Sequence, residues 1–360
     1  QREEELAINM IIKDIDMRER MVCAVEKTEP PKPPTESKGG PFFKCNREMK
    51  ATDKKGFIEA QADPDSKFMA FVRERAGKGY GTRNIAYICR NGLYLAQKDG
   101  EREPKVVVPE CLRAHIIRMH HNAQMASHQG TKRTYLQVSD TFYWPGIKKD
   151  ITRWVQACLP CRKRKTPRPL RAGITDAVLS TYPNETVAID IVGPFPESRI
   201  GNCWILTMID TFTRWPVAVA IKDRSSETIA KNIFLKLVCE RTVPLKIISD
   251  QALEFVSSGV QHLAKYMGTR MLTTSGYNPK GNASVERFHR YLNAALGIMY
   301  SKVTPNWDDY IPAILFAYRT SRNDATGYPP FFLETGREPQ TVMGNMFPEL
   351  RPKEKREEYV

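Results

Sequence analysis

The spacing of apolar residues changes near residue 185 and separates two kinds of sequence. Before it lie short helix-like stretches; between residues 146 and 158, Ile147, Ile151 and Val155 recur every four residues, which is the spacing of one helix face. After it, the runs ETVAIDIVGPF, CWILTMIDTF and PVAVAIK are rich in β-branched residues, as strands are. Helices and strands then alternate, and Ser226 is predicted to cap the first of these helices. Three consecutive strands followed by this alternation predict an α/β fold with a mixed sheet.

The first part of the chain contains a linker and a hairpin signal. EPPKPPTESKGGP, within residues 1–56, is typical of a flexible spacer. A helix-like segment, FIEAQADPDSKFMAFVRERAG, comes next. IAYICR and LYLAQ then flank Asn91-Gly92, a dipeptide that favours a type I′ turn, and KVVVP supplies a third strand. Residues 57–110 are therefore predicted to form a small extension with a β-hairpin.

Three short helical stretches follow in residues 111–165: PECLRAHIIRMHH, TKRTYLQV and GIKKDITRWVQAC. Three such helices enclose only a thin core, and units of this size usually need a metal or another cross-link. The segment therefore predicts a small domain that a bound ion holds together.

The composition of the chain indicates a class of binding partner. The chain carries 55 Lys and Arg against 41 Asp and Glu, a formal charge of +14, which favours a polyanionic partner, nucleic acid first. RKRKTPRPLR, at residues 162–171, holds six bases and no acid. This segment is interpreted either as a solvated tether or as an extended strand that follows DNA phosphates. In the second interpretation, Lys163 and Arg164 bind DNA. No apolar run reaches 18 residues, so no membrane span is expected, and eight cysteines are too few for a disulfide scaffold.

Two histidines and two cysteines have a spacing that suits zinc. Cys158 and Cys161 form a Cys-x-x-Cys pair, which supplies two thiolates from one turn. His121 and His128 would lie about 10 Å apart on a continuous helix, so the helix must end near His121 and the chain must fold back. His115 and His120 remain alternatives to His121. The set predicts a structural, tetrahedral zinc site without an open position.

Three acids in the second half predict a different metal site. Asp190 lies inside an apolar strand, where a charge is costly unless it is paired or binds a metal, and Asp250 ends the strand LKIISD. Adjacent strands could bring both to one sheet edge, and a helix could add Glu286. Three carboxylates suit two Mg²⁺ or Mn²⁺ ions and in-line phosphoryl transfer. Asp210 is assigned a supporting role and Glu254 a structural one.

With both constellations in this order, the chain resembles integrases of the gypsy-type LTR-retrotransposon and retroviral family. Thirty-five residues separate Asp250 from Glu286, as in the family's Asp-Asp-Glu pattern. VVVPECLRAHII, FYWPGIKKDI, VERFHRYLN and YRTSRNDATGYPPFFLETGREP strengthen the resemblance, which covers residues 58–340. The family combines a His-His-Cys-Cys zinc domain with a ribonuclease H-like core. The resemblance implies that Asp190, Asp250 and Glu286 are catalytic and bind the divalent ions.

The resemblance also implies the reaction and its partners. The expected function is metal-dependent trimming of the element's DNA 3′ ends and their transfer into target DNA, by a homo-multimer that binds double-stranded DNA in the host nucleus and lacks a membrane anchor. The alternative is an integrase-derived DNA- or chromatin-binding protein without catalysis. Residues one and two turns after Glu286 should face DNA, whereas the apolar stripe of this helix toward the core is predicted to be Val285, Phe288, Leu292 and Leu296. The predicted contacts are His289, Arg290, Asn293, Lys280, Lys163 and Arg164.

These features divide the chain into six segments. Residues 1–56 form a spacer, 57–110 the extension, 111–165 the zinc domain, 166–178 a basic linker and 179–340 the catalytic core. The chain opens on Gln and ends in RPKEKREEYV, so we expect a piece of a Pol polyprotein in which 341–360 is a tail and the C-terminal domain is absent or truncated.

Overall fold

The computed structural model describes residues 54–78, 81–82, 85–101, 103–164, 180–273, 283–299, 306–340 and 344–347. Residues 47–360 form one compact unit. Most of the predicted spacer and the whole of the predicted linker 166–178 lie outside the described residues. No helix of the described part is both long and apolar enough to cross a membrane.

The extension and the zinc segment share one five-stranded sheet. Its strand order is β1-β2-β3-β4-β5, antiparallel except for the parallel pair β4–β5. The predicted hairpin is confirmed: Asn91 and Gly92 have φ of 50° and 78°, as the turn requires. The elements are α2 (Lys54–Gln61), α3 (Lys67–Lys78), β1 (Gly81–Thr82), β2 (Ile85–Arg90), β3 (Leu93–Lys98), β4 (Lys105–Val107) and β5 (Phe142–Tyr143).

The single helical segment predicted at 57–77 is two helices. Between α2 and α3, the carboxylate of Asp63 accepts a hydrogen bond from the backbone N–H of Asp65, and the Ser66 hydroxyl accepts one from that of Met69. Pro64 lies between them, and its missing N–H and fixed φ break helical continuity. The apolar pattern alone did not locate this break.

The zinc segment has the three predicted helices and one more. Its helices are α4 (Glu110–His121), α5 (Thr131–Thr141), α6 (Ile147–Ala157) and the short α7 (Leu159–Arg164), with a 3₁₀ turn η1 (Gln124–Ala126) after α4. Ile151 and Val155 of α6 are buried, as the four-residue spacing predicted. The helix α7 carries the second cysteine of the Cys-x-x-Cys pair.

The second half folds around a mixed sheet of order β10-β9-β6-β7-β8. Strands β6, β7 and β8 are antiparallel, and β9 and β10 run parallel to β6. This is the ribonuclease H-like mixed sheet that the sequence predicted. The elements are β6 (Thr186–Val192), β7 (Trp204–Asp210), β8 (Pro216–Ile221), α8 (Ser226–Ile233), a π-helical turn η2 (Phe234–Val238), β9 (Lys246–Ser249), α9 (Leu253–Val256), α10 (Ser258–Met267), β10 (Arg270–Thr273), α11 (Ala283–Met299), η4 (Asp308–Tyr310), α12 (Ile311–Arg319), α13 (Pro330–Thr335) and η5 (Gly344–Met346).

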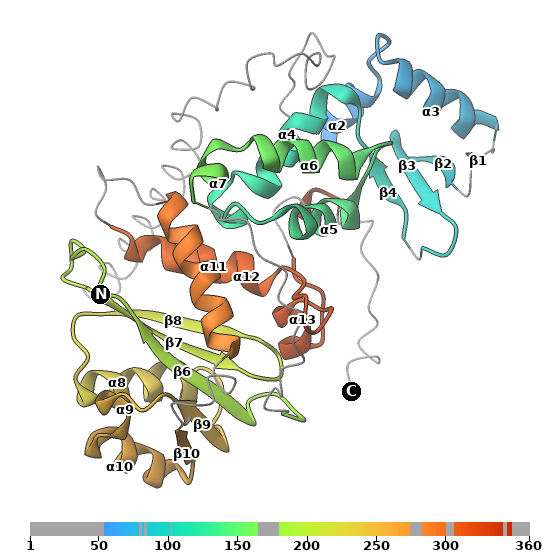
Figure 1. The fold of residues 1–360 in the computed structure, drawn as a ribbon. Coiled ribbons are helices and arrows are strands. Elements are labelled where there is room, and N and C mark those ends of the chain that lie inside the picture. The colour runs from blue at the N-terminus through green and yellow to red at the C-terminus, as the bar shows by residue number, and fades with distance from the viewer. Residues whose placement is uncertain are drawn as a thin grey trace, which may run out of the picture. The chain divides into compact units, whose positions relative to one another are not determined.

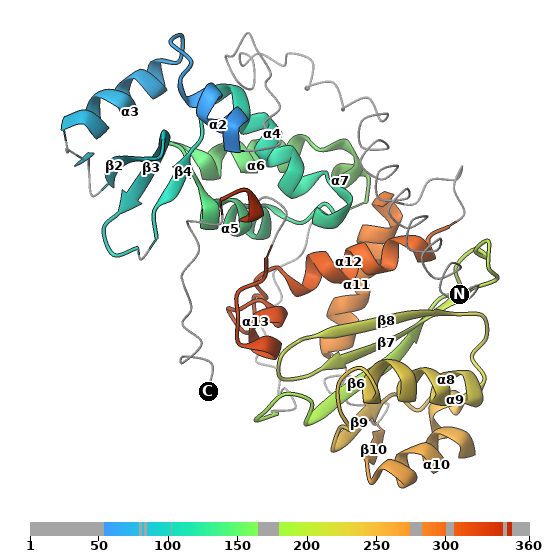
Figure 2. The same ribbon diagram turned by 180° about the vertical axis from the view of Figure 1, so that it is seen from behind.

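Helices cover both faces of this sheet. Figure 1 shows α11 crossing one face, and the reverse view in Figure 2 shows α8 and α10 on the other. On the α8 side the core includes Val187, Ile189 and Ile247. On the α11 side it includes Ala188 of β6 and the helix residues Val285, Phe288, Leu292 and Leu296, the stripe predicted from the sequence. Successive side chains of β6 thus pack alternately against the α8 side and the α11 side of the sheet.

The cap of α8 is one residue earlier than predicted. The Ser225 side chain, not that of Ser226, accepts a hydrogen bond from the backbone N–H of Thr228. The sequence SSETI offers two serines in a row, and the residue whose backbone is still extended, Ser225 at φ −62° and ψ 146°, is the one that can cap.

A buried glutamine joins the zinc segment to α12. Gln129 is 1% exposed, and its amide nitrogen donates to the carbonyl of Ala317 (2.8 Å) and to the Ser321 hydroxyl (2.5 Å). The Ser321 hydroxyl also lies 2.8 Å from the amide oxygen of Gln129. Nearby, the Arg133 guanidinium lies 5.2 Å from the ring centroid of Tyr318. The loop that follows His128 is therefore in direct contact with the core domain.

Gln129→Ala should lower the free energy of unfolding by about 1–3 kcal/mol, because it removes the buried hydrogen bonds of Gln129 to Ala317 and Ser321. Denaturant unfolding monitored by tryptophan fluorescence measures this. Lys132→Ala is the matched control, since its ion pair with Asp324 is 71% and 59% exposed and contributes little. Equal stability of the two variants would show that the Gln129 contacts do not hold the segments together.

Candidate functional site

Four side chains of the zinc segment converge as the sequence predicted. The ligand atoms of His121, His128, Cys158 and Cys161 all lie within 4.8 Å of one another. The Cys158 Sγ is 3.4 Å from His128 Nδ1, and the Cys161 Sγ is 3.5 Å from His121 Nε2. Sulfur and nitrogen ligands of one tetrahedral zinc ion are separated by roughly 3.6 Å, given bonds of about 2.3 and 2.1 Å. The residues therefore fit a structural zinc ion.

The backbone between His121 and His128 explains how the two histidines meet. The helix α4 ends at His121, and Ser127 and His128 both adopt left-handed φ values, 49° and 47°. Two such residues in succession reverse the chain and return His128 to the end of α4. The neighbouring Cys161, His121 and His128 hold the pKa of the Cys158 thiol far below its usual range, so that it is a thiolate, the form that binds zinc.

The alternative ligand His120 has a different environment. Its Nδ1 is 2.9 Å from the carbonyl oxygen of Ile116, and its ring packs edge-on against Phe142 in the core. Burial lowers the pKa of His120. The structure thus gives His120 a packing role, and neither it nor His115 belongs to the converging set.

The register of the core sheet places Asp190 beside Asp250. Ala188 of β6 pairs with Ile248 of β9 in parallel, and two residues further along each chain are Asp190 and Asp250. Because side chains alternate between faces, Asp190 lies on the face of Ala188, which is the face that α11 covers, and Asp250 directly follows the end of the neighbouring strand β9. The backbone N–H of Ile191 donates to Asp190 Oδ1 (2.8 Å), and that of Ala252 donates to Asp250 Oδ1 (3.1 Å).

Glu286 reaches this edge from the first turn of α11. Its side chain is exposed, whereas Val285 and Phe288 on either side are buried against the sheet. Burial, together with the negative charges of Asp250 and Glu286, raises the pKa of Asp190 to about 6. Of the described residues, only the zinc-type set meets the mutual distance of 4.8 Å, so the three carboxylates are spaced more widely. Their mutual repulsion fits a site that binds cations.

Two polar residues complete the surroundings of Asp190. Thr207 of β7 pairs with Asp190, and its hydroxyl donates to the Asp190 carbonyl oxygen (2.9 Å). His289 of α11 lies between them, with Nε2 2.6 Å from the Thr207 hydroxyl and Nδ1 3.6 Å from Asp190 Oδ2. Burial lowers the pKa of His289 to about 4. Sequence reasoning missed Thr207, although a lone polar residue in the apolar run CWILTMID was a signal.

The raised pKa of Asp190 predicts a pH-dependent stability in protein that holds zinc but no other metal. The folded state holds the Asp190 proton more tightly than the unfolded state, whose pKa is near 3.8. The protonated Asp190 side chain therefore stabilises the folded state fully below about pH 4, and this stabilisation is lost as the pH rises through about 6. Asp190→Asn should abolish this dependence and stabilise the protein at pH 7 by up to about 3 kcal/mol. Urea unfolding between pH 4.5 and 7.5 tests this, and parallel curves for both proteins would contradict it.

The predicted DNA contacts fall into three groups. Arg290 and Asn293 are exposed on α11, and Lys163 and Arg164 are exposed at the end of α7. His289 instead turns toward Thr207 and Asp190, because it lies one position after the buried Phe288. Lys280 lies outside the described residues.

Two further acids have local structural roles. Asp210 is fully buried, accepts a hydrogen bond from the Thr213 hydroxyl (2.6 Å) and lies 3.6 Å from Arg241 Nη2. It pairs with Val187, three residues from Asp190 along β6, so it fixes the β7–β8 turn rather than the carboxylate site. Glu254 pairs with Arg224 at 2.9 Å, which agrees with the structural role predicted for it.

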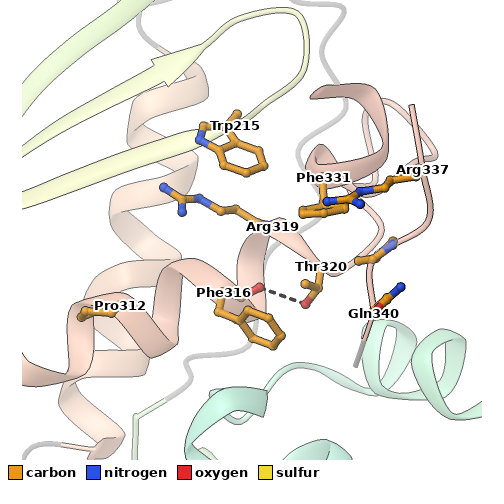
Figure 3. Close-up of a pocket in the computed structure, with 9 residues that line it drawn as sticks. Trp215, Pro312, Phe316, Arg319, Thr320, Phe331, Arg337 and Gln340 are labelled. Carbon is orange, nitrogen blue, oxygen red and sulfur yellow. Dashed lines mark hydrogen bonds between the residues drawn. The ribbon is translucent and has the colours of Figure 1, made fainter. Parts of the chain in front are cut away.

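A cavity of about 420 Å³ lies elsewhere on the core. Figure 3 shows Trp215 and Arg319 on one side of it and Phe331 and Arg337 on the other. Arg319 stacks on Trp215 at 4.3 Å from the ring centroid and donates to the Pro216 carbonyl. None of the three acids lines this cavity, so it is separate from the carboxylate site.

Two segments of the chain match known domain families. Residues 108–167 match the integrase zinc binding domain, and residues 180–279 match the integrase core domain. Asp190 and Asp250 lie inside the second match and Glu286 lies beyond it.

Two relatives match about two thirds of this chain. A human gypsy retrotransposon integrase-like protein 1 is 27% identical over 247 residues, which are 69% of this chain and 47% of that protein. The retrovirus-related Pol polyprotein from transposon 412 of Drosophila melanogaster is 27% identical over 243 residues, 68% of this chain and 19% of the polyprotein. The chain thus spans half or less of the length of these relatives. The crystal structure of the catalytic core domain of BIV integrase is 23% identical, with a TM-score of 0.35, and the match covers 42% of this chain and 93% of that one.

The zinc-type ligand set, the ribonuclease H-like sheet and both domain matches occur in one order along one chain. The protein therefore carries an integrase zinc binding domain followed by an integrase core domain, and it is similar to a gypsy retrotransposon integrase-like protein and to a retrovirus-related Pol polyprotein.

Proposed function

We propose that this protein is a polynucleotidyl transferase that trims the 3′ ends of a retroelement's DNA and joins them to target DNA. The observation that carries the proposal is the position of Asp190 on β6 beside the end of β9, which Asp250 follows, together with Glu286 on the helix α11 that covers this sheet. Carboxylate ligands at one sheet edge suit Mg²⁺ or Mn²⁺. The raised pKa of Asp190 supports the proposal, because clustered carboxylates of this kind are stabilised by a bound cation.

The chain's own residues would have distinct parts in the reaction. Asp190 and Asp250 are held by backbone N–H groups of Ile191 and Ala252, so one oxygen of each is fixed and the other is available. Two divalent ions at such a site supply activation of the attacking oxygen and stabilisation of the leaving one. Glu286, on the exposed side of α11, would complete the ligand set. The attacking group is water in trimming and a DNA 3′ hydroxyl in joining, so no protein nucleophile is required.

The surface of α11 supports DNA as the substrate. Arg290 and Asn293 are exposed one and two turns after Glu286, where a phosphate backbone approaching the carboxylates would pass. Lys163 and Arg164 add positive charge at the end of α7. A homo-multimer bound to the element's DNA ends, acting in the host nucleus, is part of this proposal. Binding should weaken steeply with salt, as phosphate contacts do.

The first experiment uses a branched DNA that mimics the product of integration. Wild-type protein, incubated with this DNA and Mg²⁺ or Mn²⁺, should reseal the target strand and release the element end. This reversal of joining needs the core site and little else. Tight DNA binding without metal-dependent resealing would favour the alternative, an integrase-derived DNA- or chromatin-binding protein without catalysis.

A further inference from the structure

The contacts around His289 engage one of its two ring nitrogens. The Thr207 hydroxyl lies 2.6 Å from His289 Nε2 and 2.9 Å from the carbonyl oxygen of Asp190. It can accept a proton from Nε2 while it donates its own to Asp190. A neutral imidazole with its proton on Nε2 presents a lone pair at Nδ1.

The second ring nitrogen, Nδ1, lies near a carboxylate oxygen. His289 Nδ1 lies 3.6 Å from Asp190 Oδ2. The other oxygen, Oδ1, already accepts the N–H of Ile191, so Oδ2 is the one available for a ligand. With the imidazole proton on Nε2, these two electron-rich atoms repel each other unless a cation lies between them. Atoms bound at about 2.1 Å to one ion are separated by roughly 3.0 to 3.6 Å at angles of 90° to 120°.

The position of His289 is firmly set by its helix. It follows Phe288, which is fully buried, and precedes the exposed Arg290, so its ring lies at the edge where α11 meets the sheet. This position restricts the orientation of the His289 ring. In histidines that bind a metal, the ring nitrogen that does not bind the ion is usually hydrogen-bonded to another group. Here the hydroxyl of Thr207 is that group.

We propose that His289 is a fourth metal ligand, which holds one ion jointly with Asp190 through Nδ1 and Oδ2. The proposal rests on the metal site of the proposed function and adds a nitrogen to its three carboxylates. Mg²⁺ takes oxygen ligands, whereas transition-metal ions accept imidazole. The site therefore selects Mn²⁺ over Mg²⁺ more strongly than three carboxylates alone would.

The test is electron spin echo spectroscopy of Mn²⁺ bound to the full chain loaded with zinc. Zinc keeps His121 and His128 occupied. The wild type should show ¹⁴N modulation from a directly bound imidazole, and His289→Asn should lose it. The same substitution should raise the Kd for Mn²⁺ roughly tenfold and change that for Mg²⁺ less than threefold. His262→Asn, which removes an exposed histidine of α10, is the matched control and should change neither.

The outcomes separate this inference from the proposed function. Asp190→Asn should abolish the Mn²⁺ signal of this site. Mn²⁺ bound through Asp190 without ¹⁴N modulation would overturn the role of His289 and leave the proposed function standing. Mn²⁺ binding unaffected by Asp190→Asn would overturn the carboxylate metal site itself. The wild-type spectrum decides the question even where a variant folds poorly.

Discussion

Glu286→Gln is expected to reduce resealing of branched DNA by at least about 10³-fold while DNA binding stays within about twofold of wild type. The substitution keeps the size of the side chain and removes only the charge that would hold a divalent ion. Because Glu286 is exposed on the first turn of α11, its loss leaves the buried stripe of that helix intact and should not affect folding. Single-turnover assays with labelled branched DNA, beside fluorescence anisotropy for binding, measure both quantities.

Glu254→Gln is the matched control for this prediction. Glu254 follows Asp250 by four residues and pairs with Arg224, so its substitution removes an equal charge from the same domain without touching the carboxylate edge. Its activity should stay close to that of wild type. A Glu286→Gln protein that reseals DNA as fast as the Glu254→Gln control would remove Glu286 from the catalytic site and, with it, the three-acid mechanism.

The core fold was predictable because its strands have a strong local pattern. Three β-branched runs in succession fixed β6, β7 and β8, and helix spacing gave the buried face of α11. The pairing of Ala188 with Ile248 was not in the pattern, since parallel pairing depends on the intervening helices. The sequence could therefore propose that Asp190 and Asp250 lie near each other, but only the register shows that the two strands end at the same edge.

The departures have local physical causes. The helical segment at 57–77 breaks because two side chains, of Asp63 and Ser66, offer hydrogen bonds that compete with the helix around Pro64. His289 was predicted to face DNA from its helical spacing after Glu286, which indicates a face of the helix but not the contacts of each side chain on it. A contact with Thr207 on a strand 82 residues away is a property of tertiary packing, which periodicity along one helix does not contain.

Removal of zinc is expected to have the largest effect on structure. Chelation should unfold the segment 111–165, seen as a loss of helical circular dichroism from α4 to α7, while the core sheet is retained. The four ligands come from α4, the loop after η1, the start of α7 and the residue before it, and burial among these short helices is too small to replace the ion. Structural zinc contributes roughly 10 kcal/mol or more in small domains of this kind.

The contact of Gln129 with α12 adds a consequence for the core. Gln129 follows the ligand His128 directly, so unfolding of the zinc segment also removes its hydrogen bonds to Ala317 and Ser321. The core should then lose about 1–3 kcal/mol of stability without unfolding. Cys161→Ser should reproduce the chelated state, and Cys239→Ser, at an exposed cysteine outside the site, should not. Unchanged helical signal and unchanged zinc content in Cys161→Ser would show that the four side chains meet for another reason than metal binding.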